Sequence, residues 1–125
     1  MTSNKFKAGD QFPVIELPAL SGDKITLGTP QPGSDWKMVV VYRGKHCPLC
    51  TRYLNEIEKR KDDFQQLGVD IAAVSADSEA QAREHSGDLV VSYPIAYGLT
   101  IEQMQQLGLY ISHPRSAQET DHPFA

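Results

Sequence analysis

The stretch Met38-Val-Val-Val-Tyr42-Arg-Gly-Lys-His46-Cys47-Pro-Leu-Cys50 decides the fold of this chain. Residues 38–42 form an unbroken apolar run rich in β-branched side chains, which predicts a central strand of a parallel sheet covered on both faces. Pro48 suits the first turn of a helix. The stretch therefore delivers Cys47 and Cys50, the only cysteines of the chain, to the point where a strand passes into a helix.

One long helix is predicted to follow, over about 48–67. Apolar residues recur there at near-helical spacing, and Gly68 supplies a C-terminal stop. The intervening charged positions are most simply a solvated surface. The apolar stripe consists of Tyr53, Leu54, Ile57, Phe64 and Leu67, and the charged face consists of Arg52, Glu56, Lys59, Arg60, Asp62 and Asp63.

The segments beyond Gly68 alternate between strand and helix patterns. Residues 69–74 predict a second buried strand, and residues 93–97 a weaker extended segment. A capping box opens each of two short helices, the first ending near Ser86 and the second at Gly108. Because each helix must cover a face of the sheet, this order indicates an α/β fold with right-handed crossovers. The capping pairs are Ser78 with Gln81 and Thr100 with Gln103.

The residues before the opening stretch predict a peripheral hairpin. Two short apolar runs, 14–17 and 24–27, are joined through a Ser-Gly-Asp turn, and Pro13 and Pro18 mark an edge position. Trp36 lies beside the next strand, where we expect it to cap the core rather than to touch a substrate.

Length and composition limit the classes of protein that fit. With 125 residues, 40% of them apolar, the chain fits a single soluble domain over residues 1–125, in which 112–125 form an irregular polar tail. The formal charge of −4 gives no basic field for nucleic acid. No run reaches the roughly 18 apolar residues of a membrane span, and the N-terminus lacks a signal-peptide segment, so we expect a cytoplasmic protein.

The spacing of the two cysteines predicts redox chemistry. At a helix start, Cys47 and Cys50 project on one side of the first turn, close enough for their sulfurs to bond. Unpaired N–H groups and the helix dipole stabilise a thiolate there, so we expect Cys47, as the more N-terminal and more exposed sulfur, to be the nucleophile. Cys50 would then resolve the mixed disulfide or sulfenic acid that forms on Cys47.

Two other interpretations of the cysteine pair stay open. Both thiols could be inert and partly buried. A structural zinc site needs four ligands, and beyond the cysteines the chain offers four histidines and no second cysteine pair. We therefore expect neither a metal nor a cofactor.

Basic residues near the pair are candidates for stabilising the thiolate. His46 could supply positive charge to Cys47 or shuttle a proton, although a residue just outside a helix is as often simply solvated. Arg43 could stabilise an anion from the end of the strand. His85 and Arg83 are expected on a solvated helix, and the two remaining histidines lie in the tail.

The block Tyr42-Arg-Gly-x-His46-Cys47-Pro-x-Cys50 resembles the peroxiredoxin-like proteins of the alkyl hydroperoxide reductase/thiol-specific antioxidant (AhpC/TSA) group, within the thioredoxin superfamily. The resemblance covers most of the chain. It implies a thioredoxin-like fold, with a mainly parallel central sheet flanked by helices and an N-terminal hairpin. Further matching stretches are Gly9-Asp-Gln-Phe-Pro13, residues 69–74 running into Ser75-Ala-Asp77, and Tyr97-Gly98.

The resemblance also implies a function, that of a thiol-dependent oxidoreductase. In this group the first cysteine attacks a peroxide or a disulfide, the second resolves the product, and a thioredoxin- or glutathione-type reductant returns the electrons. On the matching positions of this chain, these roles fall to Cys47 and Cys50.

Two features set the chain apart from the family pattern. Typical peroxiredoxins carry the motif Pro-x-x-x-[Thr/Ser]-x-x-Cys. In this chain, Val40 occupies the proline position and Gly44 the threonine or serine position, so the hydroxyl that helps to orient a peroxide is absent. This departure gives weight to thiol–disulfide exchange. The family also continues past Ala125 with a β-hairpin and a helix, so we expect this sequence to be a C-terminally truncated, incomplete member of the group in which residues 38–42 leave an open sheet edge. We expect a homo-oligomer through that edge. The alternative to an oxidoreductase is a catalytically incompetent thioredoxin-like module that binds itself or a partner.

Overall fold

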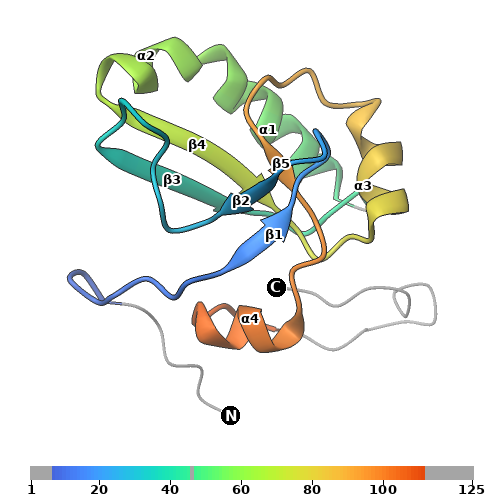
Figure 1. Ribbon diagram of the computed structural model, residues 1–125. Helices are drawn as coiled ribbons and strands as arrows, with labels where there is room; N and C mark the ends of the chain where they lie inside the picture. The colour runs from blue at the N-terminus through green and yellow to red at the C-terminus, as the bar shows by residue number, and fades with distance from the viewer. Residues whose placement is uncertain (1–6, 46, 112–125) are drawn as a thin grey trace.

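The computed structural model describes residues 7–45 and 47–111, along which strands and helices alternate (Figure 1). No helix in this described part is both long and apolar enough to cross a lipid bilayer. The elements in chain order are β1 (Glu16–Pro18), β2 (Lys24–Thr26), β3 (Trp36–Val41), α1 (Pro48–Lys59), α2 (Lys61–Gln66), β4 (Val69–Val74), α3 (Glu79–Ser86), β5 (Ile95–Ala96) and α4 (Ile101–Gln106).

A parallel sheet of three strands, in the order β3-β4-β5, forms the centre of the fold. Strand β3 pairs with β4 from Trp36 opposite Val69 to Val41 opposite Val74. The prediction that the first of these strands is central is therefore wrong, because β4 is central and β3 lies at an edge. Burial agrees with this order: β4 is buried from Ile71 onward, whereas β3 is at most half-buried along its length.

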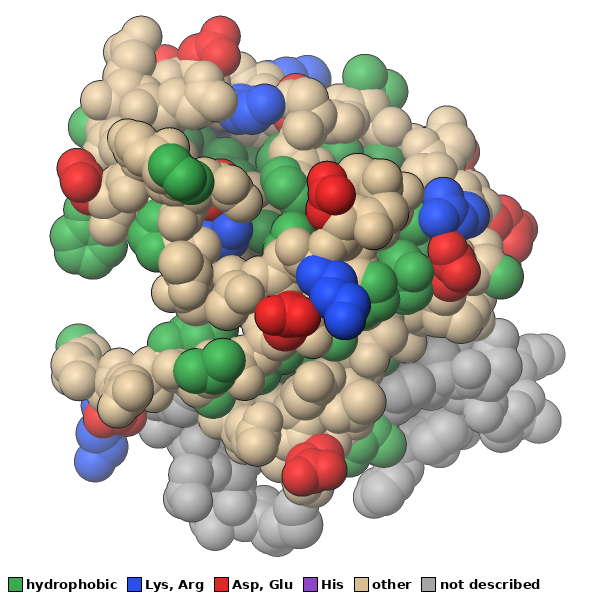
Figure 2. Space-filling model, in the orientation of Figure 1, with side chains coloured by type: hydrophobic (Ala, Val, Ile, Leu, Met, Phe, Trp, Pro, Cys, Tyr) green, Lys and Arg blue, Asp and Glu red, His purple; other side chains and the backbone are tan. Residues whose placement is uncertain are grey.

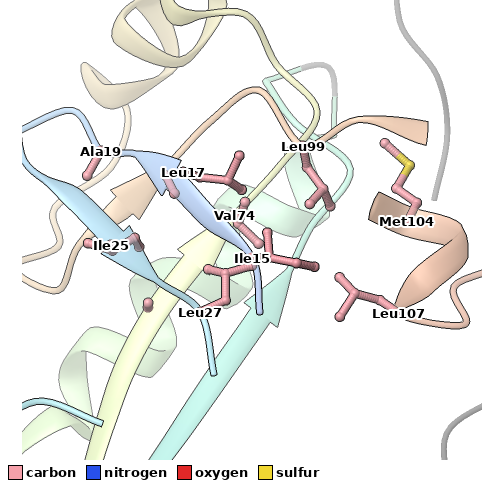
Figure 3. Close-up of a cluster of buried hydrophobic side chains, with 11 residues drawn as sticks. Ile15, Leu17, Ala19, Ile25, Leu27, Val74, Leu99, Met104 and Leu107 are labelled. Atoms are coloured by element: carbon pink, nitrogen blue, oxygen red, sulfur yellow. The ribbon is translucent and has the colours of Figure 1, made fainter. Parts of the chain in front are cut away.

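The predicted hairpin is confirmed and covers one face of the sheet. Strands β1 and β2 pair antiparallel, with Leu17 opposite Ile25, and form a sheet of their own. Their inward side chains nevertheless belong to the core, where they pack with β4 and α4 (Figure 3). The buried members of this cluster are Ile15, Leu17, Ala19, Ile25, Leu27, Ala72, Val74, Ala96, Leu99, Met104 and Leu107.

Helices α1 and α2 lie over the opposite face of the sheet (Figure 1). Leu54 of α1 is 1% exposed and packs in a second buried cluster. Full burial of such a side chain contributes roughly 1.5–3 kcal/mol to stability. Alternate residues of β4 thus enter alternate clusters, as expected for a strand buried on both faces. The buried members of the second cluster are Tyr42, Leu54, Ile71, Ala73, Tyr93 and Ile95.

The helix predicted over 48–67 is two helices rather than one. It breaks at Arg60, which ends α1 and begins α2 with φ −106°, ψ 9° and no side-chain cap. The run between Ile57 and Phe64 is charged and supplies no apolar side chain to hold a continuous helix on the sheet. Two members of the predicted apolar stripe are exposed, Tyr53 at 67% and Leu67 at 73%.

Trp36 begins β3 and is 68% exposed, so the prediction that it caps the core is wrong. Its N–H donates to the Gly68 carbonyl at 3.0 Å, which starts the pairing with β4. The next side chain, Lys37, is the buried one. It forms an ion pair with Asp70 at 2.9 Å, in which the side chains are 4% and 15% exposed.

The segment between α3 and β5 runs along helix α1 and is held there by side chains. The Asn55 amide nitrogen donates to the Asp88 carbonyl at 3.2 Å, and its oxygen accepts the Val90 N–H at 2.8 Å. One turn later, the Glu58 carboxylate accepts the N–H and the hydroxyl of Ser92 at 3.0 and 2.6 Å. These side chains satisfy backbone groups that lack a partner strand.

Both predicted capping boxes are confirmed. The Ser78 hydroxyl accepts the Gln81 N–H at 3.2 Å, and the Gln81 side chain accepts the Ser78 N–H at 2.9 Å. Thr100 and Gln103 make the same pair of hydrogen bonds at the start of α4. Helix α3 ends at Ser86, as its sequence predicts.

Acidic and basic side chains are interspersed on the face shown in Figure 2. Ion pairs of the surface include Lys24 with Glu16 at 3.9 Å and Arg83 with Glu79 at 2.7 Å. Such exposed pairs contribute about 0–1 kcal/mol each, so the fold depends on its two apolar clusters rather than on surface charge.

Candidate active site

Cys47 occupies the N-cap of helix α1, as the sequence predicts. Its backbone is extended, with φ −112° and ψ 98°, and its N–H donates to the Gly44 carbonyl at 3.1 Å. Its sulfur accepts the Cys50 N–H at 3.3 Å. The sulfur thus takes the place of the hydroxyl or carboxylate that usually caps a helix, facing an N–H group that favours negative charge.

The relative burial of the two thiols is the reverse of the prediction. Both cysteines are free, but Cys47 is only 6% exposed whereas Cys50 is half-buried. The prediction that Cys47 is the more exposed sulfur is wrong, because its side chain turns back onto the first turn of α1 to cap the Cys50 N–H.

Cys50 lies in surroundings that keep its thiol protonated. Burial raises the pKa of the Cys50 thiol, and its hydrogen bond to the Cys47 sulfur raises it further. The backbone and the positive charge of Arg43 act in the opposite direction but do not cancel these effects. Of the predicted basic residues, the structure therefore brings Arg43 to the cysteine pair. His46 lies outside the described residues.

The loop before Cys47 rests on a buried acid, Asp77, which is 1% exposed. The Asp77 carboxylate accepts the Lys45 N–H at 2.9 Å, and the Asp77 N–H donates to the Ser75 hydroxyl at 3.2 Å. Gly44 has φ +120°, and a Cβ at this position would collide with the Asp77 carboxylate. Glycine is therefore required at 44 both by the backbone conformation and by the close approach of the acid.

Sequence reasoning did not identify Asp77 as a site residue, although a signal was present. Asp77 follows the carboxyl end of β4, and Cys47 follows the carboxyl end of the neighbouring strand β3. Segments that leave the carboxyl ends of adjacent parallel strands meet at one edge of a sheet, where α/β proteins place their sites.

His85 is buried, so the prediction that it lies on a solvated helix is wrong. It is 2% exposed, and its Nε2 lies 2.7 Å from the Thr51 hydroxyl of α1. Burial lowers the pKa of His85, while Asp77 and Asp88 act in the opposite direction. The spacing from the buried Ala82, three residues earlier on α3, was the available signal.

Arg83 behaves as predicted and lies on the exposed side of α3. It forms its ion pair with Glu79 one turn earlier, and both side chains are 53% exposed. The structure therefore separates the two basic residues of this helix, since only His85 faces the cysteine helix.

Tyr42 is a buried neighbour of His85 and of Cys50. It is 6% exposed, and its ring centroid lies 5.9 Å from that of His85. Burial raises the pKa of Tyr42 to about 12; the Ser75 hydroxyl lowers it, and the charges of Asp77 and Cys50 raise it. The Tyr42 hydroxyl has no hydrogen-bond partner among the described residues that meets the usual distance and angle limits, although the Ser75 hydroxyl is near enough to lower its pKa. Tyr42 is thus a neutral group beside the site.

Within residues 7–45 and 47–111, no group of three or more histidine, cysteine, aspartate or glutamate side chains could hold a metal ion. His46, His113 and His122 lie outside the described residues.

A match to a protein-family model identifies the family to which the chain belongs. The model of the AhpC/TSA family matches residues 8–122. This chain belongs to the AhpC/TSA family. No curated protein matches the sequence. Membership of the AhpC/TSA family supports a thiol-dependent redox function.

Solved structures agree with the family and confirm the thioredoxin-like α/β fold. A mutant of peroxiredoxin 6 of Arenicola marina is 25% identical, with a TM-score of 0.73 over 95% of this chain and 56% of that chain. AhpC of Mycobacterium tuberculosis is also 25% identical, with a TM-score of 0.69 over 84% of this chain and 68% of that one. A protein described as the thiol:disulfide interchange protein DsbE, from Chlorobium tepidum, is 15% identical with a TM-score of 0.66, covering 85% of this chain and 73% of its own, and shares the fold.

The chain is shorter than some of these AhpC/TSA and thioredoxin-fold structures. It spans 56% of the Arenicola marina protein and 64% of a peroxiredoxin-like protein from Aquifex aeolicus. In the described part of the chain, no β-hairpin follows α4.

Proposed function

We propose that this AhpC/TSA family member is a thiol-dependent oxidoreductase in which Cys47 is the nucleophile and Cys50 the resolving thiol. The observation that carries the proposal is the cap of α1, where the Cys47 sulfur accepts the Cys50 N–H at 3.3 Å. An N–H group directed at a sulfur favours the thiolate, which is the nucleophilic form. The two cysteines are therefore unequal before any substrate binds.

The first step is attack by the Cys47 thiolate. On a disulfide, a new S–S bond forms, the substrate S–S bond breaks and one substrate sulfur leaves as a thiolate. On a hydroperoxide, an S–O bond forms and the O–O bond breaks; the departing alkoxide or hydroxide takes a proton, and Cys47 becomes a sulfenic acid.

Cys50 then completes the reaction. Its thiol loses its proton and attacks the Cys47 sulfur, which forms the Cys47–Cys50 disulfide and expels the second substrate thiolate, or hydroxide that leaves as water. The raised pKa of Cys50 suits this order, because it keeps the resolving thiol protonated until Cys47 has reacted. A thioredoxin- or glutathione-type reductant would supply the two electrons that restore both thiols.

Arg43 and His46 are proposed to support the anion on Cys47. Arg43 is half-buried, and its charge already acts on the neighbouring thiol of Cys50. For His46 the support is its place in the sequence, directly before Cys47.

The loop at Gly44 favours a disulfide over a peroxide as the substrate. Peroxiredoxins carry threonine or serine at this position of their motif. Here φ is +120° and a Cβ would meet the Asp77 carboxylate, so the loop has no room for that hydroxyl. Without it a peroxide lacks one of its orienting groups, whereas attack by a thiolate on a disulfide does not depend on that hydroxyl.

The test is turnover of a small disulfide and of hydrogen peroxide, each with a thioredoxin system as the reductant. We expect measurable turnover of the disulfide, slower turnover of the peroxide, and loss of both in Cys47→Ser. If Cys47→Ser retains the wild-type rates, the proposed role of Cys47 is wrong. The exposed variant Arg52→Gln, on the outer side of α1, is the control for a change of charge near the site.

The second candidate function is that of a non-catalytic module that associates through the edge of β3. The N–H groups of Trp36 and Tyr42 donate to the β4 side. By the alternation of a strand, the N–H groups of Lys37, Val39 and Val41 point away from β4, where no described strand pairs with them. Such an edge is a template for another chain. Light scattering should then show a dimer or a larger assembly, whereas a monomer at high concentration would contradict association. Turnover that depends on Cys47 would reject the idea of a non-catalytic module.

We also propose a single domain over residues 1–125 and a cytoplasmic location. The family match over residues 8–122 supports the single domain. Two free thiols in one helical turn fit a reducing compartment. The predicted irregular tail, 112–125, lies outside the described residues.

A further inference from the structure

A polar link joins helix α3 to the first turn of the cysteine helix. His85 Nε2 and Thr51 Oγ1 lie 2.7 Å apart, although the two residues are 34 positions apart in the sequence. His85 is 2% exposed, so this contact is shielded from solvent. This part-buried hydrogen bond restrains both elements, because loss of the Thr51 hydroxyl leaves the buried His85 imidazole without that partner.

The link continues from Thr51 to Cys47. The Thr51 hydroxyl donates to the Cys47 carbonyl at 3.4 Å, and the Thr51 N–H donates to the same carbonyl at 3.2 Å. When the Thr51 hydroxyl donates to this carbonyl, its oxygen can accept from His85 Nε2–H; which of the two groups donates at the 2.7 Å contact depends on the tautomer of His85. In that arrangement His85 carries its proton on Nε2, and its buried Nδ1 has no hydrogen-bond partner among the described residues.

Four segments of the chain contribute a group to the surroundings of His85. Thr51 comes from α1, the Tyr42 ring from the end of β3, Asp77 from the end of β4 and Asp88 from the segment after α3. The two carboxylates act on the imidazole through charge. The neutral hydroxyl of Thr51 is the group within hydrogen-bond distance. His85 is therefore placed to orient Thr51 rather than to exchange a proton with Cys47.

We propose that His85 is a positioning residue for Cys47, acting through the Thr51 hydroxyl. The His85–Thr51 link fixes the Cys47 carbonyl and the first turn of α1, and so holds the Cys50 N–H on the Cys47 sulfur. The inference rests on the proposed function in one respect, that Cys47 is the reacting thiol. It adds a residue from a different element, which neither the cysteine motif nor the family block contains.

The test is alkylation of Cys47 by iodoacetamide across the pH range in which thiols titrate, in a Cys50→Ser background so that one thiol reacts. Thr51→Val removes the hydroxyl at nearly constant volume, and Thr51→Ser keeps it. We expect Thr51→Val and His85→Phe each to move the midpoint of the rate profile upward by about half a pH unit or more. Thr51→Ser should keep the wild-type midpoint.

The double variant Thr51→Val/His85→Phe separates a shared link from two independent effects. Its shift should not exceed the larger of the two single shifts, because both substitutions break the same link. Shifts that add, an unchanged midpoint in Thr51→Val, or an equal shift in Thr51→Ser would each overturn the proposal. If His85→Phe does not fold, the comparison of Thr51→Val with Thr51→Ser decides.

Alkylation requires no disulfide, peroxide or reductant. A chain without turnover, but with the expected shifts, would overturn the proposed function and leave the positioning role standing. Turnover by the wild type, with unchanged alkylation profiles in the variants, would support the proposed function and overturn the positioning role of His85.

Discussion

The carboxylate of Asp77 lies directly against Gly44, so the loop that carries the cysteine pair rests on a buried acid rather than on an apolar layer. The same carboxylate accepts the Lys45 N–H at 2.9 Å. The loop can therefore lie close to the sheet for two reasons. Gly44 lacks a side chain, and the Asp77 carboxylate occupies the space that a side chain at position 44 would take.

Replacing Gly44 by alanine is expected to destabilise the fold by about 4 kcal/mol or more, because backbone strain adds to a collision with a buried group. Gly22→Ala is the matched control. Gly22 also has positive φ, at +95°, but no atom lies within 4 Å of the position that a Cβ would take there, so strain alone should cost about 1–3 kcal/mol. Urea unfolding of both variants measures the difference, and equal losses would show that the Asp77 contact is unimportant.

Removing the acid should release the loop locally. In Asp77→Ala the Lys45 N–H loses its acceptor, so its hydrogen exchange should accelerate about tenfold or more, as expected for the loss of about 1–3 kcal/mol. Asp77→Asn keeps an acceptor oxygen and should retain most of the protection. NMR exchange rates of the Lys45 amide measure both, and similar acceleration in the two variants would point to the charge rather than to the hydrogen bond.

Stability should decrease as the pH falls below the ordinary pKa of histidine. Burial lowers the pKa of His85 in the folded chain, so the unfolded chain takes up this proton first. The His85 contribution is thus fully present above about pH 6.5 and is lost as the pH falls toward the folded-state pKa. Urea unfolding at neutral and mildly acidic pH should show a smaller pH dependence in His85→Phe than in the wild type. An identical dependence in both would assign the effect to other groups.

The two thiols should give different masses after oxidation. With one equivalent of peroxide or of a small disulfide, the wild type should lose two hydrogens as Cys47 and Cys50 join. Cys50→Ser should instead keep one oxygen atom or one substrate thiol on residue 47, and Cys47→Ser should remain largely unmodified. Intact-mass spectrometry distinguishes these products. Equal modification of both single variants would contradict the assignment of nucleophile and resolving thiol.

The buried pair of Lys37 and Asp70 should be sensitive to loss of one partner. Lys37→Met leaves the Asp70 carboxylate uncompensated near the interior and is expected to cost about 3–5 kcal/mol. Lys24→Met is the control, since its pair with Glu16 is exposed and should contribute about 0–1 kcal/mol. Chemical unfolding of the two variants gives the comparison, and a small loss in Lys37→Met would mean that water reaches Asp70.

Much of the fold followed from local patterns. The capping boxes at Ser78 and Thr100 gave helix starts to the residue, because a cap is a contact between neighbours in the sequence. The order of the strands could not be obtained in this way. An apolar run such as 38–42 indicates a buried strand, but which strand lies at the centre depends on pairing between distant segments.

The candidate site was likewise predictable only where its contacts are local in the sequence. The cysteine pair and its place at the start of a helix were predictable, because motif and helix start lie within a few residues. Asp77 and His85 were missed, because the signals for them are weak: a polar residue on a short helix or after a strand is exposed in most cases. The imidazole is buried only in the folded chain, where it meets Thr51 of α1 and the ring of Tyr42.

Asn55 has a further consequence for the way in which the molecule opens. A single amide side chain binds the segment between α3 and β5 at two backbone groups, and Glu58 binds it again one turn later. That segment and α1 should therefore open as one cooperative unit, even though the segment belongs to no helix or strand. A partner that displaces the segment between α3 and β5 would therefore also displace helix α1.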